Sequence, residues 1–253
     1  MKKTAIIWLA FFMLFSCQNP DINVVSSETL QIYDSIYVGI DKVIDFTSDG
    51  DYFYLLTNTE IIKVNNNGSI LERTPQSNIT GICFDRTDKK IQKITSAGII
   101  IDKSGDTLLL TDISQYYGDS DIVAMPIFIA YNEQIYYSCL EIGYPPDHFS
   151  YSSQIAMFSH DGGYLSLFTF LNGIPEAIYI HKNILYYIGR NGDFIDTNYR
   201  EIEGDLRKYN ISDKKLINYI IIPFPAPVGL YIDDNDNYYS YSLYSKSIIK
   251  YRN

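Results

Sequence analysis

Short runs of apolar, aromatic and β-branched residues alternate along most of this chain with turns of Asp, Asn, Gly and Ser. Runs of four to eight such residues between turn signals predict β-strands. After the N-terminal segment no run shows the 3.6-residue apolar period of a helix. The pattern therefore predicts an all-β protein.

One type of strand recurs five times, and it marks the start of a repeating unit. The apolar second positions of this strand are Ile44, Ile82, Ile127, Ile178 and Leu230. Two further strand-like runs follow each copy, and a fourth run closes four of the five units, as in "SILERT" and "YLSLFT". Four antiparallel strands per unit are typical of a β-propeller blade, so the sequence predicts a five-bladed β-propeller.

The fifth unit has only three strand-like runs before the sequence stops at Asn253. "TLQIYD", residues 29–34, matches the missing run and belongs to no other unit. In many propellers a strand from one terminus completes the blade that the other terminus forms. The ring is then closed, and no strand edge is left open to pair with another chain. We therefore expect residues 29–253 to form one propeller domain that the N-terminal strand closes.

The first residues have the features of a bacterial lipoprotein signal. Lys2 and Lys3 precede an unbroken apolar run over residues 5–15, which is too short to span a bilayer and typical of a signal peptide. The run ends in "LFSC", which resembles a lipobox and implies that Cys17 carries a lipid such as palmitate. An ordinary secretory signal is the alternative. We expect a signal peptide at 1–16 and a tether at 17–28.

A family resemblance follows from these motifs. The order apolar-Gly-apolar-x-apolar-Asp, turn, Tyr-Tyr, then Ile-x-x-aromatic is similar to NHL-type repeats. With the lipobox, the whole chain resembles bacterial lipoproteins described as six-bladed propellers, so a six-bladed-like ring is the alternative to five blades. Gln18 after the cysteine resembles lipoproteins of the Gram-negative outer membrane, which implies a membrane-anchored protein on the periplasmic or surface-exposed side. The resemblance implies no general activity.

The charge of the chain argues against nucleic acid as a partner. Thirty acidic residues outweigh 20 basic ones, for a formal charge of −10, and such a chain is repelled by phosphate backbones. Membrane attachment therefore depends on the lipid. Cys83 and Cys139 lie in apolar runs and are expected to be buried thiols, although a disulfide between them is permitted.

The sequence predicts neither a metal nor a cofactor site. It has no glycine-rich phosphate loop and no G-x-S-x-G elbow, and its three histidines lack zinc-ligand spacing. "DDNDN", residues 233–237, has the alternate spacing of a calcium loop, but Tyr238 stands in place of the required Gly and Tyr244 in place of the bidentate Glu. We interpret this segment as a turn between the first two strands of the last blade.

The favoured function is a binding or scaffold module for a glycan, a peptide or an envelope partner. Three expanded loops, 111–125, 141–153 and 190–204, belong to one face of the predicted ring and mix aromatic with polar residues. Tolerated insertions are the alternative explanation of these loops. The candidate ligand-binding residues are Tyr116, Tyr117, Tyr144, Asp147, His148, Tyr151, Phe194, Asp196, Tyr199 and Arg200.

The competing hypothesis is an enzyme of the glycoside hydrolase type. Such an enzyme needs two carboxylates on either side of the sugar bond, and the predicted inner strands offer Asp45, Asp85, Glu176 and Asp233. No motif of those hydrolases is present, and a fold does not by itself carry an activity. The non-enzymatic hypothesis is therefore preferred.

Overall fold

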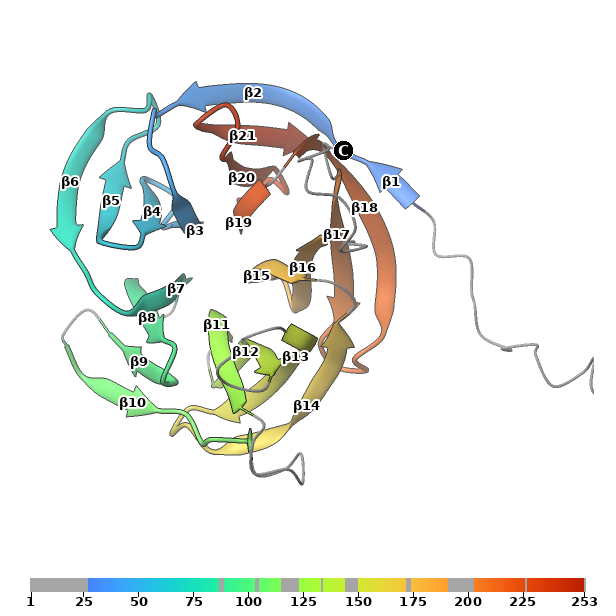
Figure 1. Cartoon of the computed structure of the whole chain (residues 1–253). Coiled ribbons are helices and arrows are strands. Elements are labelled where there is room, and N and C mark those ends of the chain that lie inside the picture. Colours follow the sequence, from blue (N-terminus) through green and yellow to red (C-terminus); the bar gives the residue numbers. More distant parts are fainter. Residues whose placement is uncertain are drawn as a thin grey trace, which may run out of the picture.

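The protein is a five-bladed β-propeller, as the repeats predict. The computed structural model describes residues 27–86, 89–102, 105–114, 123–132, 134–143, 150–171, 174–190, 203–225 and 227–252. Within these residues, five β-sheets are arranged in a ring around a central axis (Figure 1). We number the blades I to V in the order in which their inner strands occur along the chain.

Each blade is a meander whose first strand is innermost (Figure 1). The inner strands are β3 (Val43–Ser48), β7 (Ile79–Asp85), β11 (Val123–Asn132), β15 (Ile174–His181) and β19 (Pro227–Ile232). The second strands are β4 (Phe53–Thr57), β8 (Lys90–Thr95), β12 (Ile135–Gly143), β16 (Ile184–Arg190) and β20 (Tyr238–Ser242). The third strands are β5 (Glu60–Val64), β9 (Ile99–Ile101), β13 (Ser150–Ser159), β17 (Glu203–Asn210) and β21 (Ser247–Arg252). The outer strands of blades I to IV are β6 (Ile70–Pro75), β10 (Thr107–Leu109), β14 (Tyr164–Leu171) and β18 (Leu216–Pro225).

The N-terminal segment closes the ring, and it does so over two blades. β2 (Gln31–Tyr37) pairs antiparallel with β21 and is the outer strand of blade V. It begins and ends slightly later than the predicted segment, residues 29–34. β1 (Ser27–Thr29), which the pattern did not predict, pairs in parallel with β18 of blade IV. The same segment therefore extends one blade and completes the next.

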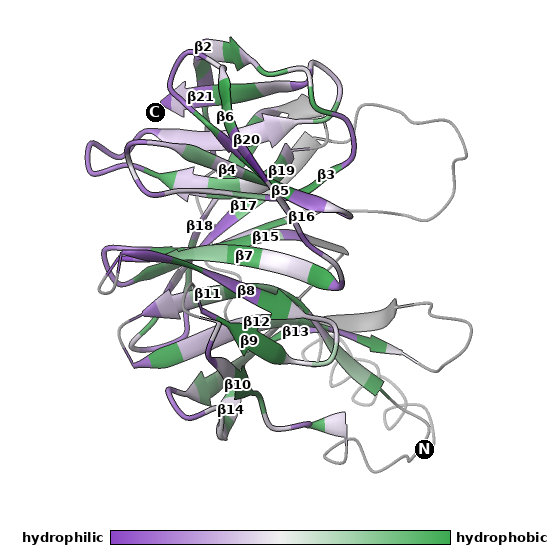
Figure 2. Cartoon of the chain, turned by 90° about the vertical axis from the view of Figure 1, so that its left-hand side faces the viewer, coloured by the Kyte–Doolittle hydropathy of each residue, from purple (hydrophilic) through white to green (hydrophobic). Residues whose placement is uncertain are grey.

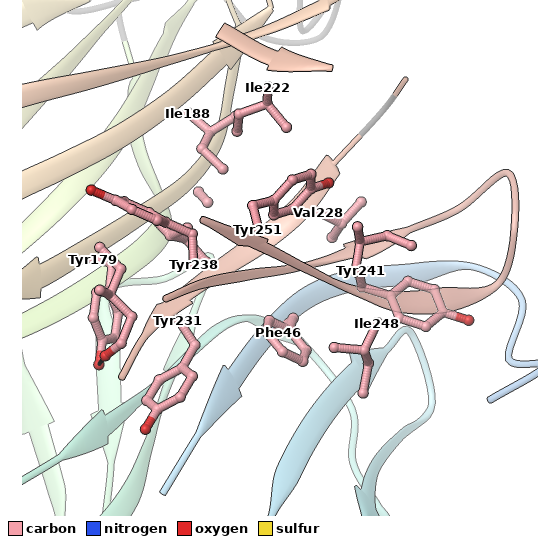
Figure 3. Close-up of a cluster of buried hydrophobic side chains, with 14 of the residues drawn as sticks. Phe46, Tyr179, Ile188, Ile222, Val228, Tyr231, Tyr238, Tyr241, Ile248 and Tyr251 are labelled. Atoms are coloured by element: carbon pink, nitrogen blue, oxygen red, sulfur yellow. Dashed lines mark hydrogen bonds between the residues drawn. The ribbon is translucent and has the colours of Figure 1, made fainter. Parts of the chain in front are cut away.

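The core lies between the blades and not within one layer. The residues of β19 are all buried, whereas those of β6 are all exposed, because an inner strand is covered by neighbouring blades on both faces. The largest buried cluster joins side chains of blades IV, V and I, among them Ile188, Tyr251 and Phe46 (Figure 3). Apolar positions are accordingly spread over all the blades in the edge-on view (Figure 2).

Every inner strand contains one register irregularity against its second strand. Ile44 and Ile127 are the extra residues at two of these β-bulges, whereas Ile82 and Ile178 pair directly with the second strand. The positions that line up in the sequence are therefore not all equivalent in the ladder. A bulge adds twist and bends the strand, which suits a strand at the crowded centre of a ring.

The two cysteines outside the N-terminal segment, Cys83 and Cys139, are buried free thiols. They belong to different apolar clusters. Burial raises the pKa of both thiols, so they behave as small apolar side chains.

Among the described residues, no helix is long and apolar enough to cross a membrane.

Adjacent blades are joined at the turns that lead into the outer strands. Gly68, in the turn before β6, lies against the last residues of β2 in the preceding blade, and a Cβ there would be 2.3 Å from the carbonyl oxygen of Tyr37. Gly162, before β14, has the same relation to Leu109 at the end of β10, and its own carbonyl accepts a hydrogen bond from the Thr111 amide. Close backbone contact between blades thus requires glycine in both turns.

Replacing Gly68 and Gly105 by alanine, one at a time, separates the free-energy cost of a clash between blades from the cost of backbone strain. Gly68 and Gly105 have φ angles of +86° and +88°, but a Cβ on Gly105 meets nothing within 4 Å. Both Gly→Ala changes add about 1–2 kcal/mol of left-handed strain, and only Gly68→Ala adds a steric clash of about 1–3 kcal/mol. We expect Gly68→Ala to lower the melting temperature more than Gly105→Ala, and equal melting temperatures would contradict this account of the junction.

Candidate functional site

In each blade one residue lies where the inner strand enters its first turn. In blades I and V this residue is an aspartate, and the two aspartates have the same kinds of hydrogen-bond partner. Asp49 of blade I accepts hydrogen bonds from two amides of its turn and from the hydroxyl of Tyr54, at 2.7 Å. Asp233 of blade V does the same, with the hydroxyl of Tyr239 at 3.1 Å. The carboxylate closes the turn, and a tyrosine of the second strand holds the carboxylate.

This arrangement explains the "DDNDN" segment. Asp233 accepts hydrogen bonds from the amides of Asn235 and Asn237 and from the Asn237 side chain. Burial works to raise the pKa of Asp233, but the hydrogen bonds from Asn237 and Tyr239 outweigh it and hold the pKa below its usual value. Its oxygens are thus engaged within a turn. In the part of the chain that the structure describes, no group of three or more His, Cys, Asp or Glu is placed to hold a metal ion.

Blades III and IV depart from the aspartate pattern. Asn132 ends the inner strand of blade III, and His181 ends that of blade IV. In blade II the corresponding Asp85 accepts a hydrogen bond from the Gln92 side chain at 3.0 Å. The two blades that lack the turn aspartate are neighbours, so their polar side chains are free of the turn-closing role at adjacent places on the ring.

A pocket lies at this place, between the first turns of blades II, III and IV, and we call it the inner-turn pocket. Its volume is about 230 Å³, which corresponds to roughly seven or eight water molecules. The pocket is lined by Phe84, Asp85, Arg86, Tyr131, Asn132, Tyr179, Ile180, His181, Lys182 and Asn183.

Arg86 reaches from blade II to the far side of the ring. Its Nη2 donates to the hydroxyl of Tyr179 at 3.2 Å and to the carbonyl of Ile232 at 3.1 Å. Its Nη1 forms an ion pair with Asp234, also at 3.1 Å. Two of these partners belong to blade V and one to blade IV, so the guanidinium is held over the inner strands by groups that lie far from it in the sequence.

His181 is buried, with a side chain only 1% exposed. Its Nε2 lies 3.1 Å from Asp236 Oδ1, and a hydrogen bond from Lys182 lowers the pKa of Asp236, which is therefore ionised. A carboxylate only accepts hydrogen bonds, so Nε2 carries the proton. Burial, together with the nearby Arg86, lowers the pKa of the imidazole. The ring is therefore neutral near pH 7, and its Nδ1 is a buried acceptor that has no hydrogen-bond partner among the residues that the structure describes.

The turn of blade IV presents a second cation beside His181. Lys182 and Asn183 have φ angles of 48° and 61°, the left-handed pair typical of a two-residue hairpin turn. Non-glycine residues seldom adopt this conformation. Lys182 Nζ contacts both carboxylate oxygens of Asp236, at 2.8 and 2.9 Å, so the turn of blade V is held by this turn as well.

The residues proposed on the expanded loops are not tested by the structure. Tyr116, Tyr117, Tyr144, Asp147, His148, Phe194, Asp196, Tyr199 and Arg200 lie outside the described residues, as does Cys17. Tyr151 belongs to β13, and nothing further is described for its side chain. The inner-turn pocket, by contrast, is formed by turns of the opposite set, which connect first to second strands.

The carboxylates of the hydrolase hypothesis have separate structural surroundings. The carboxyl group of Asp45 accepts hydrogen bonds from the amides of Phe46 and Ile82, at 2.8 and 2.7 Å, and so joins blade I to blade II. Glu176 is at the bulge of β15, away from the His181 end of that strand. Asp85 and Asp233 are engaged with Gln92 and with the turn of blade V.

Comparison with known proteins supports the fold. No protein-family model and no curated protein matches the sequence, so the similarity to NHL-type repeats stays a prediction. The crystal structure of Myxococcus xanthus glutaminyl cyclase aligns with a TM-score of 0.62 at 8% identity, over 89% of this chain and 97% of that one. A gluconolactonase from Xanthomonas campestris aligns with a TM-score of 0.54 at 11% identity, over 89% and 85%. At these identities the likeness establishes a β-propeller and nothing of the chemistry.

The sequence pattern gives His181 no role beyond that of a histidine without zinc-ligand spacing, and it does not single out Arg86, Asn132 or Lys182. One signal was available, because a comparison of the five first turns shows Asp in blades I, II and V but Asn132 and His181 in blades III and IV. The reach of Arg86 across the ring had no such signal. Its partners Tyr179 and Asp234 are 93 and 148 residues away.

The pH dependence of stability tests the environment of Asp45. Burial raises its pKa from 3.8 to about 7, although the two amide hydrogen bonds oppose the shift. Between these values the unfolded chain is ionised while the folded protein keeps the proton, so the contribution of Asp45 to stability is present below about pH 4 and is lost as the pH rises to about 7.

We expect the difference in unfolding free energy between wild type and Asp45→Asn to fall by up to about 1.4 kcal/mol per pH unit across this window. Urea unfolding at four pH values from 4.5 to 7.5 measures it, with Asp106→Asn at an exposed turn as the control. A difference that stays constant with pH would contradict a protonated Asp45.

Proposed function

We propose that this protein is a membrane-tethered binding module whose propeller holds a small polar ligand in the inner-turn pocket. The observation that carries the proposal is the cluster of departures from the repeat. Asn132 and His181 replace the turn aspartate in adjacent blades, and both line the inner-turn pocket, which Arg86 also lines. Local rules of a repeat are most often broken where a protein has a function.

The composition of the pocket supports a small ligand rather than a folded partner. Its volume of about 230 Å³ is below the usual range of drug-sized sites, and amide, imidazole, guanidinium and ammonium groups provide donors and acceptors beside the rings of Tyr131 and Phe84. A glycan end group, the end of a peptide or a small part of an envelope component fits this chemistry. Binding at the expanded loops remains a separate proposal.

The ligand-binding proposal is tested on the full chain in detergent. Isothermal titration with neutral sugars, acidic sugars, amino acids and short peptides is repeated with Asn132→Leu, which keeps the size of the side chain but removes its amide. We expect at least one ligand class to bind and the variant to weaken it about ten-fold, the cost of one or two lost hydrogen bonds. Asn58→Leu, at an exposed turn between second and third strands, is the control. Equal binding by both variants would contradict the pocket as the site.

We further propose that the tether is a lipid on Cys17 and that the protein resides in the outer membrane. The support is the basic start, the apolar run and "LFSC" at the N-terminus. In this arrangement, residues 18–26 link the lipid to β1, which is the first described element of the ring. The lipid anchors the chain, and the propeller is the ligand-binding part.

Phase separation in a cloud-point detergent tests the lipid anchor. The wild-type chain is expected to partition into the detergent phase, and Cys17→Ser to lose the lipid and to remain either uncleaved or soluble. Mass spectrometry of the mature N-terminus distinguishes these two states. A Cys17→Ser protein of mature length that still enters the detergent phase would show that another feature holds the chain to the membrane.

A further inference from the structure

We infer that the ligand of the inner-turn pocket is a small hydroxylated oxyanion, of the sugar-acid class, whose anionic group replaces Asp234 on Arg86. The inference rests on the proposed binding function and adds the chemical class of the ligand. It depends on three features of the pocket: the two cations that line it, the way in which Arg86 is held, and the uncharged polar groups of His181 and Asn132.

Two cationic side chains line the pocket of an otherwise acidic chain. Arg86 and Lys182 line it, and among the described residues Asp85 is the one lining carboxylate. Asp85 is 2% exposed and accepts a hydrogen bond from Gln92, so its carboxyl group is engaged within the protein. In a chain of formal charge −10, two cations at one small pocket favour a ligand of negative charge, and an arginine fork fits a carboxylate or a phosphate.

Arg86 is pre-positioned by buried partners and neutralised by an exposed one. The hydroxyl of Tyr179, which is 6% exposed, and the carbonyl of Ile232 orient the guanidinium. The remaining partner, Asp234, has a side chain that is 88% exposed. Ion pairs with such an exposed carboxylate contribute little net free energy, so a ligand oxyanion can replace Asp234 while Arg86 stays in place and little reorganisation is needed.

Lys182 repeats this arrangement on the neighbouring blade. It pairs with Asp236, and both side chains are more than half exposed, at 54% and 58%. Asp234 and Asp236 belong to the same turn of blade V. One acidic turn therefore occupies both cations of the pocket when no ligand is bound.

The uncharged part of the pocket selects hydroxyl groups. Nδ1 of neutral His181 is a buried acceptor without a partner among the described residues, and it therefore suits an O–H donor of the ligand. The amide of Asn132 offers both a donor and an acceptor, and the ring of Tyr131 offers an apolar face of the kind that packs on sugar C–H groups. A sugar acid combines these features with the negative charge.

Isothermal titration on the full chain compares D-glucuronate with D-glucose, which has the same ring without the carboxylate, and with inorganic phosphate. We expect glucuronate to bind at least ten-fold more tightly than either, with an affinity that falls as salt is added. Arg86→Gln and Lys182→Gln should each weaken glucuronate about ten-fold or more and leave glucose nearly unchanged. Asp234→Asn should tighten glucuronate by roughly two- to five-fold, because it removes the competing carboxylate.

Matched control variants exist elsewhere on the ring. Arg73 pairs with Glu60 at 46% exposure, and Lys246 pairs with Asp41 at 40% exposure. Arg73→Gln and Lys246→Gln should leave every affinity unchanged. Circular dichroism melts show whether Arg86→Gln folds. If it does not, Arg86→Lys, which keeps the charge but not the fork, and Lys182→Gln, at an exposed side chain, supply the comparison.

Two outcomes overturn the inference and leave the pocket as a binding site: equal binding of glucose and glucuronate, or equal binding of phosphate and glucuronate, in each case weakened by Asn132→Leu. Loss of glucuronate binding in Arg73→Gln to the same extent as in Arg86→Gln overturns it as well, since the effect is then one of general charge. If none of the three probes binds, this inference is wrong, and the wider panel of sugars, amino acids and peptides decides the proposed pocket function. If no ligand of that panel binds either, or if none is sensitive to Asn132→Leu, the proposed pocket function is wrong as well.

Discussion

The pairing of β2 with β21 is the contact on which the rest of the structure depends. Most residues of β2 are exposed, as expected of an outer strand, but β2 pairs along the whole edge of β21, and its Ile36 packs against the core that blades IV, V and I share. Leu30 lies between β1 and β2, is 1% exposed, and belongs to that core. Its amide donates to the carbonyl of Ile221 in β18 at 3.0 Å. One N-terminal segment thus ties blade IV to blade V, and the position of each inner turn follows from the closed ring.

The tyrosines give the propeller much of its core and also set its turns. Tyr137, Tyr187, Tyr241 and Tyr251 are among the largest fully buried side chains, while Tyr54 and Tyr239 direct their hydroxyls to the turn aspartates. A tyrosine in the second strand can pack its ring between blades and still satisfy a polar group at the turn. Where the turn aspartate is absent, in blades III and IV, Asn132 and His181 stand in its place, and His181 is hydrogen-bonded to Asp236 in the turn of blade V instead of closing its own turn. The repeat and its exceptions therefore have a common physical basis.

The charge arrangement around the pocket couples three blades. Arg86 of blade II and Lys182 of blade IV each pair with an aspartate of the same turn in blade V, and His181 is hydrogen-bonded to that turn as well. These contacts join the inner ends of the blades in the way that Gly68 and Gly162 join the outer turns. A ligand that competed for the cations would act on the turn of blade V, which connects the proposed binding event to the part of the ring that the N-terminal strand closes.

The sequence by itself determined the strand class, the five repeats, the closing role of the N-terminal strand and the turn nature of residues 233–237. These features are local, because side-chain alternation and turn residues can be recognised within a few neighbouring positions of the sequence. The tertiary structure decided the bulge that shifts Ile44 and Ile127 out of register, the parallel pairing of β1, the burial of His181 and the reach of Arg86. Each of these depends on segments that only the closed ring brings together, such as Arg86 and Asp234, 148 residues apart, and no local pattern encodes a contact across the axis.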